Sequence, residues 1–208
     1  MTGEARREVI EQAALGVFAE RGFHGASMDE IATRAGVTVP VVYDHFGSKI
    51  ALHRRLLERT RDELLAMWRQ NLAADEPAGE RIGRALDAWA RYVQEHPYAP
   101  RMFFLETTGD PEVRAIHREV QQQARAALSA ILGREPGATE IAGADEVGLE
   151  MAAEVMRAGL TGLAIWWNEH PDVPRERIVA TAMNAIWIGL ERLGRGESWT
   201  PGSGSGLG

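Results

Sequence analysis

Residues 27–49 read SMDEIATRAGVTVPVVYDHFGSK, and this stretch decides the fold of the N-terminal part of the chain. Ser27 is a favoured N-cap residue, and Glu30 three positions later completes the pattern of a capping box. Gly36 stands where a residue in the left-handed conformation ends a helix at little cost. Thr38 can then cap the next helix. The stretch therefore predicts two short helices joined by a tight turn.

The second of these helices has one apolar face and one free face. Val42 and Phe46 are four residues apart, so they share the face that can anchor the helix to a core. A short helix with one buried face and free N-terminal side chains fits the major groove of DNA. An ordinary helical hairpin inside an all-helical core would show the same spacing, so the spacing alone leaves both interpretations open. The side chains left facing elsewhere are Thr38, Val39, Pro40, Val41, Tyr43, Asp44 and His45.

A family resemblance favours the DNA-binding interpretation. Over about residues 4–60 the chain resembles the Tet repressor family of bacterial transcriptional regulators, through AALGVFAERGFHGASMDEIATRAGV and VVYDHFGSKIAL. The resemblance implies a helix-turn-helix at about residues 27–46, an all-helical fold of about nine helices, and a homodimer that binds DNA. The elements that carry it, in order, are Gly22-Phe23, Ile31-Ala32, Ala35-Gly36-Val37, Tyr43 with Phe46, and Ser48-Lys49.

Composition and charge narrow the class of protein. The chain has 208 residues, 45% of them hydrophobic, and no cysteine, which excludes disulfides and thiolate metal sites. Its N-terminus lacks the apolar stretch of a signal peptide, and no apolar run is long enough to span a membrane, so we expect a cytoplasmic protein. The net charge is −7, but residues 1–62 hold nine basic and nine acidic residues, so the acidity lies outside the predicted DNA-binding part. A neutral DNA-binding part predicts modest non-specific affinity.

Helix periodicity and breakers organise the chain into two parts and a tail. We predict an N-terminal helix-turn-helix domain over 1–50, a C-terminal helical ligand-binding and dimerisation domain over 51–200, and a flexible tail over 201–208, where the sequence is glycine-rich. No strand pattern appears. The predicted helices cover about residues 4–21, 28–35, 39–46, 49–73, 80–95, 101–106, 111–132, 145–169 and 175–193.

The DNA contacts are predicted around the third helix. Val39, Pro40 and Val41 carry no side-chain hydrogen-bonding group, so they can offer only apolar contact to thymine methyl groups. The resemblance implies phosphate contacts for Tyr43 and His45. Other candidates are Lys49, at the start of the fourth helix, the hydroxyl groups of Ser27 and Thr38, and, more loosely, Arg34. The acid Asp29 leaves the half-site sequence open, because it would repel phosphate or accept from a cytosine amino group.

The larger part is rich in large, soft side chains between residues 65 and 170, which helical cores also use. The family resemblance implies a ligand cavity among these helices, and apolar walls would suit a small hydrophobic or aromatic effector. Ligand in the cavity would move the fourth helix and lower DNA affinity, which makes a repressor the predicted function. The effector-contacting candidates are Trp89, Tyr92, Phe103, Phe104, His117, Met151 and Trp166.

The last two predicted helices suggest a dimer interface. Both contain many small residues, which allow close approach of helices, together with apolar side chains. The family resemblance implies an interface made of two helices from each of two chains, and a two-fold dimer would match a palindromic operator. The interface candidates are Ile178, Ala182, Met183, Ile186, Trp187 and Leu190.

An enzyme and a helical interaction module are the two alternatives to a regulator. An enzyme is disfavoured, because HExxH, Glu-x-x-His and GxSxG motifs are missing and the six histidines lack ligand spacing, so we expect no catalytic residue, cofactor or metal. A helical interaction module with a vestigial helix-turn-helix fits the neutral N-terminal part and Asp29. Titration with DNA of unrelated sequence at varied salt separates that module from a sequence-specific protein.

Overall fold

The computed structural model describes residues 2–73, 76–97, 99, 102, 110–134 and 146–188. Within these ranges the fold is all-α, as the sequence predicted, and it has eight α-helices and one π-helical turn that the sequence did not predict. The predicted helix at 101–106 and the tail at 201–208 lie outside the described residues, apart from Met102. No helix in the described ranges combines the length and the apolarity needed to cross a membrane.

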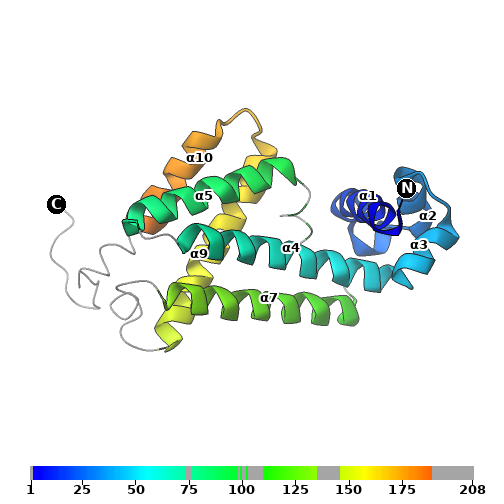
Figure 1. Cartoon of the computed structure of the whole chain (residues 1–208), viewed down its shortest axis with the longest axis horizontal. Helices are drawn as coiled ribbons and strands as arrows, with labels where there is room; N and C mark the ends of the chain where they lie inside the picture. Colours follow the sequence, from blue (N-terminus) through cyan, green and yellow to red (C-terminus); the bar gives the residue numbers. More distant parts are fainter. Residues whose placement is uncertain are drawn as a thin grey trace.

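Three helices form a compact unit at one end of the molecule (Figure 1). Helix α1 spans Gly3–Gly25, α2 spans Met28–Ala35, and α3 spans Val39–Phe46. The positive φ of Gly22, 67°, breaks the helical path near the end of α1. This break lets the ring of Phe23 stack on that of Phe18, with the ring centres 6.1 Å apart and the rings nearly parallel. The Gly-aromatic pair therefore closes α1 over the core of the unit.

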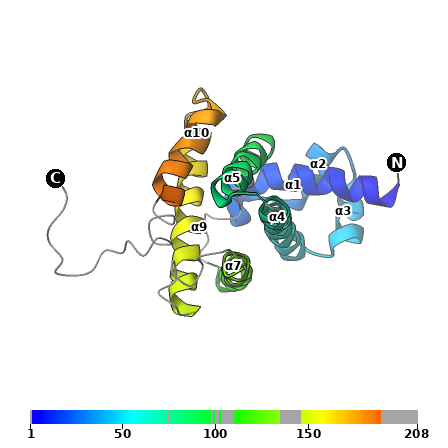
Figure 2. The ribbon, with the colours of Figure 1, turned by 60° about the vertical axis from the view of Figure 1, so that its left-hand side comes forward.

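Helix α4, Lys49–Leu72, runs from this unit along the length of the larger part. It packs against α5, Ala78–Glu95, on one side and α7, Pro111–Leu132, on the other. Helix α9, Glu146–Glu169, lies across α7, and α10, Arg175–Ala182, packs on α5 and continues as the π-helical turn Met183–Trp187. Figure 2 shows α9 and α10 together on one side of α4, α5 and α7.

Two hydrophobic cores lie along α4. The first joins α1, α2 and α3 to the N-terminal half of α4, where Leu52, Leu56 and Leu57 are almost completely buried. Ile116 and Val120 of α7 extend this first core into the larger part. The second core joins the C-terminal half of α4 to α5, α7, α9 and α10. Since α4 contributes to both cores, a shift of this helix would be felt at both ends of the molecule.

Candidate DNA-binding face and effector cavity

The side chains of α3 divide into an anchored face and an outward face. Val42 is completely buried against the first core, and its burial stabilises the docking of α3 by about 1.5–3 kcal/mol. Tyr43, the next residue, keeps 46% of its surface exposed, and Thr38 and Pro40 are exposed too. The first turn of α3 is therefore open to a partner, as a recognition helix requires.

The two valines at the start of α3 are less free than the sequence suggested. Val39 and Val41 are half-buried and pack against the first core. Only part of each side chain can reach a thymine methyl group, so the rest of each valine holds α3 in place. Their contact with DNA bases stays a prediction.

Ser27 and Thr38 both occupy N-cap positions, but only one of them caps. Ser27 Oγ accepts from the backbone N–H of Glu30 at 3.1 Å, whereas the Thr38 side chain makes no capping hydrogen bond. This differs from the expectation for Thr38. The physical reason is Pro40 at the second helical position, which removes one of the two N–H groups that an N-cap side chain can bond. The contact of the Thr38 hydroxyl with a phosphate oxygen stays a prediction.

Lys49 performs a structural task that the sequence did not reveal. Its Nζ donates to the carbonyl oxygens of Phe23 at 2.8 Å and Ala26 at 2.9 Å. It also lies 4.6 Å from the centre of the Phe23 ring. The ammonium group thus satisfies carbonyls at the C-terminal end of α1, where a cation is favoured. Of its three N–H donors, two are already used inside the protein, so the expected phosphate contact has to share this group.

Arg34 and His45 also differ from the roles expected of them. Arg34 donates to both carboxylate oxygens of Glu20, at 2.8 and 2.5 Å, and to Glu30 at 3.0 Å. The bonds to Glu20 tie α2 to α1, so the Arg34 side chain is held away from DNA by its carboxylate partners. His45 is half-buried and lines a polar groove of about 690 Å³ between α1 and α4. A histidine in this position is not a simple surface group facing phosphate.

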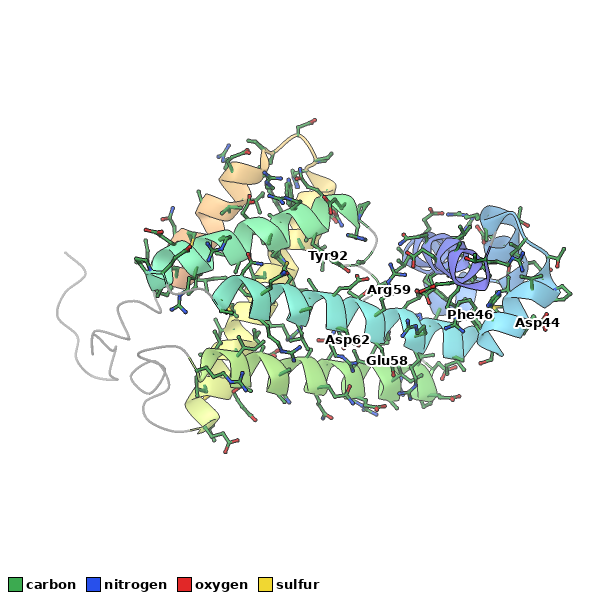
Figure 3. All side chains as sticks on the ribbon, in the orientation of Figure 1. Asp44, Phe46, Glu58, Arg59, Asp62 and Tyr92 are labelled. Atoms are coloured by element: carbon green, nitrogen blue, oxygen red, sulfur yellow. The ribbon has the colours of Figure 1, made fainter. Side chains whose placement is uncertain are left out.

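A charged cluster at this groove joins the three-helix unit to the larger part. Arg59 of α4 donates to Glu8 at 2.8 Å, to Glu11 at 2.6 Å and to Glu63 at 2.7 Å. Glu63 in turn accepts from the Tyr92 hydroxyl of α5 at 2.8 Å. Figure 3 shows Arg59 on the side of α4 that faces α1, with Tyr92 on α5 nearby. We call these five residues the Arg59 cluster.

Burial makes the Arg59 cluster energetically important. The side chain of Glu11 is only 2% exposed and that of Arg59 is 18% exposed. Burial lowers the pKa of Arg59, but its hydrogen bonds with Glu8, Glu63 and Glu11 outweigh that effect and raise it. Burial, together with the charge of Glu63, raises the pKa of Tyr92. Tyr92 was expected to contact the effector, and the structure instead gives its hydroxyl to this cluster.

A buried histidine pair joins α4 to α7. The Nε2 atoms of His53 and His117 lie 3.0 Å apart, and the His53 ring packs edge-on against Phe18 and Phe23 of α1. Burial, followed by the nearby His117 and Lys49, lowers the pKa of His53 to about 3. Neutral imidazoles suit this contact, since one ring nitrogen can donate to the other. His117 was expected at the effector, but the structure places it here instead.

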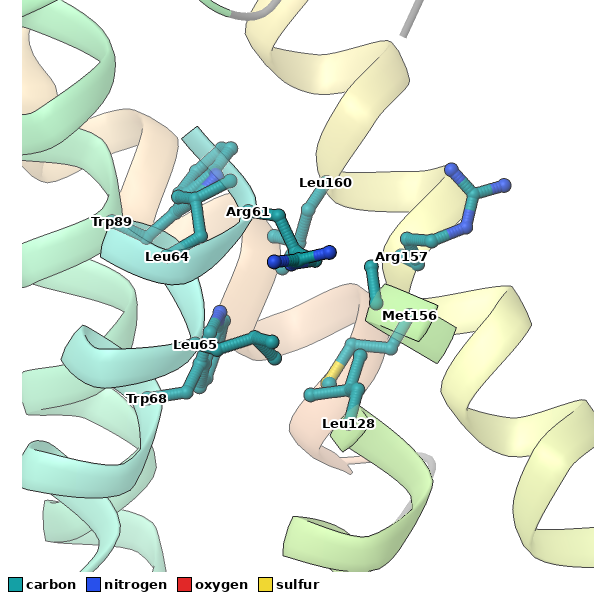
Figure 4. Close-up of a pocket in the computed structure, with 10 residues that line it drawn as sticks. Arg61, Leu64, Leu65, Trp68, Trp89, Leu128, Met156, Arg157 and Leu160 are labelled. Atoms are coloured by element: carbon teal, nitrogen blue, oxygen red, sulfur yellow. The ribbon is translucent and has the colours of Figure 1, made fainter. Parts of the chain in front are cut away.

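An apolar cavity lies between α4, α5, α7 and α9, and its volume is about 60 Å³. Figure 4 shows its walls, which include Trp68 and Leu65 of α4, Trp89 of α5, Leu128 of α7 and Met156 of α9. Sites for small molecules usually measure roughly 300–1,000 Å³. The cavity described here is therefore too small for such a molecule, and a ligand would have to widen it. The remaining lining residues are Arg61, Leu64, Ala124, Arg157 and Leu160.

One of the effector-contacting candidates lines this cavity, namely Trp89. Met151 is 65% exposed and Trp166 is 43% exposed on the outer face of α9. These two point outward because α9 carries apolar side chains on two faces, of which only one meets the second core. Phe103 and Phe104 lie outside the described residues.

The predicted interface residues are mostly occupied within one chain. Ile178 and Ala182 are 2% and 1% exposed and belong to the second core, since α10 packs on α5. Two glycines of α5 make room for the π-helical turn: a Cβ on Gly79 would stand 3.4 Å from the Trp187 indole, and one on Gly83 would stand 3.9 Å from Met183. Ile186 also packs against the second core, and Leu190 lies outside the described residues.

The outer face of α9, one of the two helices predicted at the interface, carries exposed apolar surface. Val147, Met151 and Val155 follow one another at four-residue spacing and are 62%, 65% and 71% exposed. Exposed small residues continue this face toward Trp166. We call these four named residues the α9 stripe.

The N-terminal helices are similar in sequence to a family of known proteins. Residues 10–56 match the family model described as bacterial regulatory proteins, tetR family. The HTH-type transcriptional activator FasR of Mycolicibacterium smegmatis is 28% identical over 197 residues, which cover 91% of this chain and 85% of that protein. The chain belongs to the tetR family. It is thus a DNA-binding transcriptional regulator, and the matched segment runs from α1 into α4.

Solved structures of two regulators show the same fold. The fatty acid degradation regulator FadR from Bacillus halodurans gives a TM-score of 0.71 at 18% identity, covering 92% of this chain and 95% of that one. FadR from Bacillus subtilis, solved in complex with stearoyl-CoA, gives 0.69 at 19% identity, covering 91% and 98%. At these identities the two structures support the fold alone.

Proposed function

We propose that this tetR-family protein is a homodimeric repressor that binds a palindromic operator and is released by a small, largely hydrophobic effector. The observation that carries the proposal is the geometry of α3. Val42 is buried, while Thr38, Pro40 and Tyr43 stay exposed on the first turns. The proposed DNA-binding face consists of Ser27, Thr38, Val39, Pro40, Val41 and Tyr43, with partial contributions from His45 and Lys49.

The α9 stripe supports the dimer. Three large apolar side chains and a tryptophan at helical spacing would be costly to leave in water, at about 25 cal/mol for each Å² of apolar surface. A two-fold interface buries the same face of both chains, so the stripe rather than α10 would form its centre.

The apolar cavity supports the proposal of a hydrophobic effector. Its walls are apolar, and α4, which supplies four of the lining residues, also carries the first core beneath α3. Two relatives are named for fatty acid degradation or solved with stearoyl-CoA, which favours a ligand with a long acyl chain. A ligand that widens the cavity would displace α4, and an effector must favour the state that does not bind DNA by about 1–3 kcal/mol to act usefully.

Selection of genomic fragments by the purified protein at near-physiological salt tests the proposal. We expect enrichment of one short palindrome, whose half-sites lie about one helical turn, roughly 34 Å, apart. Recovery without a common site would contradict the proposal and favour the helical interaction module. If one palindrome is enriched, the bound fragments should dissociate when the effector is added.

An activator is the second candidate function, because the relative FasR is named as an activator and is aligned over most of its length. In vitro transcription from a selected promoter separates the two. A repressor lowers transcript yield on addition of protein, and an activator raises it.

A further inference from the structure

Asp44 is the single acidic residue of α3, and we infer that its carboxylate accepts a hydrogen bond from the amino group of a cytosine in each operator half-site. Asp44 is then a residue that determines DNA sequence specificity. This inference rests on the proposed function, since it requires α3 in the major groove of DNA. It adds a polar base contact to the apolar contacts expected from Val39 and Val41.

The position of Asp44 on α3 is the first step. Its side chain is exposed, as are those of Pro40 and Tyr43, whereas Val42 is completely buried. Residues four apart share one face of a helix, so Asp44 and Pro40 lie together on the outward side of α3. Figure 3 shows Asp44 at the outer edge of the three-helix unit, away from the larger part. A helix of eight residues is about 12 Å long and the major groove is about 12 Å wide, so the last turn of α3 can also reach base edges.

No residue that the structure describes compensates the charge of Asp44. The residues three and four positions away are Pro40, Val41, Gly47 and Ser48, so no cation can pair with it along the helix. Its carboxylate makes no hydrogen bond or ion pair within the described ranges. Asp44 also lies in the last turn of α3, where the helix dipole disfavours a negative charge. The acid therefore brings no stability to its own helix, and we expect its partner to be on the DNA.

The other two acids between residues 27 and 46 have favourable surroundings within the protein. Asp29 is exposed as well, but it stands in the first turn of α2, where the helix dipole favours a negative charge. Glu30 stands in the same turn and pairs with Arg34 at 3.0 Å. Asp44 differs from both, because it has neither a cation nor a helix N-terminus beside it.

Two cations of this region are engaged inside the protein. Arg34 bonds to Glu20 and Glu30, and the Lys49 ammonium group donates to two backbone carbonyls. Asp44 therefore keeps its negative charge when DNA approaches. A carboxylate that loses its water beside phosphate groups lowers affinity, unless a donor on a base edge takes the place of that water. The acid thus penalises most sequences and permits those that present the donor.

The chemistry of base edges selects cytosine as that donor. In the major groove, guanine and thymine present acceptors, which repel a carboxylate, whereas cytosine and adenine present an amino group. The adenine amino group lies beside N7, which is an acceptor, but cytosine has a C–H group next to its amino group. An ionised carboxylate only accepts, so cytosine gives it the more favourable edge. Hydrogen bonds to an ionised acceptor are roughly twice as strong as neutral ones.

Fragment selection with substituted full-length proteins tests the inference. We expect the palindrome of the unaltered protein to contain one C·G pair in each half-site that Asp44→Ala no longer selects, because the preference at that position falls about 10- to 100-fold. Asp44→Asn should select adenine at the same position, since an asparagine amide can bond both N6 and N7 of adenine. The control is Glu4→Gln, which removes an exposed acid from the first turn of α1 and should leave the motif unchanged.

A modified base tests the contact directly. Methylation of the selected cytosine at N4 keeps the hydrogen used in base pairing and replaces the one that faces the major groove. In fluorescence anisotropy titrations, this modification should weaken binding of the unaltered protein about 10- to 100-fold and should leave the affinity of Asp44→Ala unchanged. An equal loss in both proteins, half-sites without a C·G pair, or a changed motif from Glu4→Gln overturns the inference.

The outcome is separable from the proposed function. One enriched palindrome that Asp44→Ala selects in the same form refutes the cytosine contact and leaves sequence-specific DNA binding intact. Absence of any palindrome with the unaltered protein refutes the proposed function, and the cytosine contact with it.

Discussion

The substitution Arg59→Met would remove the centre of the Arg59 cluster while keeping an apolar stem. Glu8 and Glu63 have side chains that are 54% and 36% exposed, so water replaces most of what they lose. Glu11 is 2% exposed, and its remaining cationic contact would be Arg55 at 3.4 Å, whose side chain is 51% exposed. Removing one partner of such a buried pair costs about 3–5 kcal/mol. The remaining Arg55 contact places the expected loss near the lower limit, about 3 kcal/mol.

Thermal unfolding measures this loss at a fixed protein concentration. For a chain of this size, each kcal/mol lowers Tm by about 2–4 °C, so we expect a fall of roughly 6–12 °C. The control Arg54→Met removes a pair with Glu119 in which the two side chains are 40% and 49% exposed. It should lower Tm by less than about 4 °C, since exposed pairs contribute about 0–1 kcal/mol.

A double substitution makes the reasoning refutable. If the cost of Arg59→Met comes from an uncompensated buried carboxylate, then Glu11→Met in the same chain should restore most of the lost stability. A Tm for the double variant that is lower still, or a single variant indistinguishable from Arg54→Met, would show that the cluster does not hold a costly buried charge.

The remaining predictions concern the histidine pair, the α9 stripe and α3. The pKa of His53 is near 3 in the folded protein and about 6.5 in the unfolded chain, so its contribution to stability is complete above pH 6.5 and falls with decreasing pH, by about 2 kcal/mol at pH 5. Urea titrations should show that this loss disappears in His53→Leu. The same pH dependence of stability in His53→Leu as in the unaltered protein would contradict the prediction. Val155→Lys should give a monomer by analytical ultracentrifugation, whereas Glu150→Lys, on an exposed position of the same helix, should not; dimers from both variants would remove the α9 stripe from the interface. Val41→Ala should relax selectivity at a thymine, because it removes apolar contact with the methyl group, and fragment selection should then give a more degenerate motif. Tyr43→Phe should weaken binding to all sequences by a similar factor. A base-specific change from Tyr43→Phe would reverse these assignments.

The helices were predictable because their ends are encoded locally. Ser27, Ser48 and Asp110 each accept backbone N–H bonds at the first turn of a helix, and Gly36 and Gly47 take positive φ values at helix ends. Cap chemistry of this kind depends on a few neighbouring residues, so it is visible in a single sequence.

The faces of the helices were harder to predict. Helix α9 carries one apolar series through Ala153, Met156 and Leu160, which is buried, and another through the α9 stripe, which is exposed. Both series have helical spacing, so periodicity could not say which one meets the core. Met151, predicted at the effector, lies on the exposed series for this reason, and its role stays a prediction.

The polar contacts between distant segments could not be predicted at all. Lys49 meets carbonyls of Phe23 and Ala26, more than 20 residues earlier in the chain, and His53 meets His117, 64 residues away. Such contacts depend on how helices cross, which no local pattern contains. The same limitation hid the apolar cavity, whose walls come from α4, α5, α7 and α9.

The small volume of the cavity, about 60 Å³, makes the binding of an apolar chain depend on its length. Each buried methylene group contributes about 0.8 kcal/mol, whereas separating the four surrounding helices has a cost that is roughly the same for any chain that enters. Short chains gain too little to force the helices apart, and beyond a threshold each added carbon is net favourable. On the proposed function, we therefore expect a minimum chain length for the effector, below which a compound leaves DNA binding unchanged.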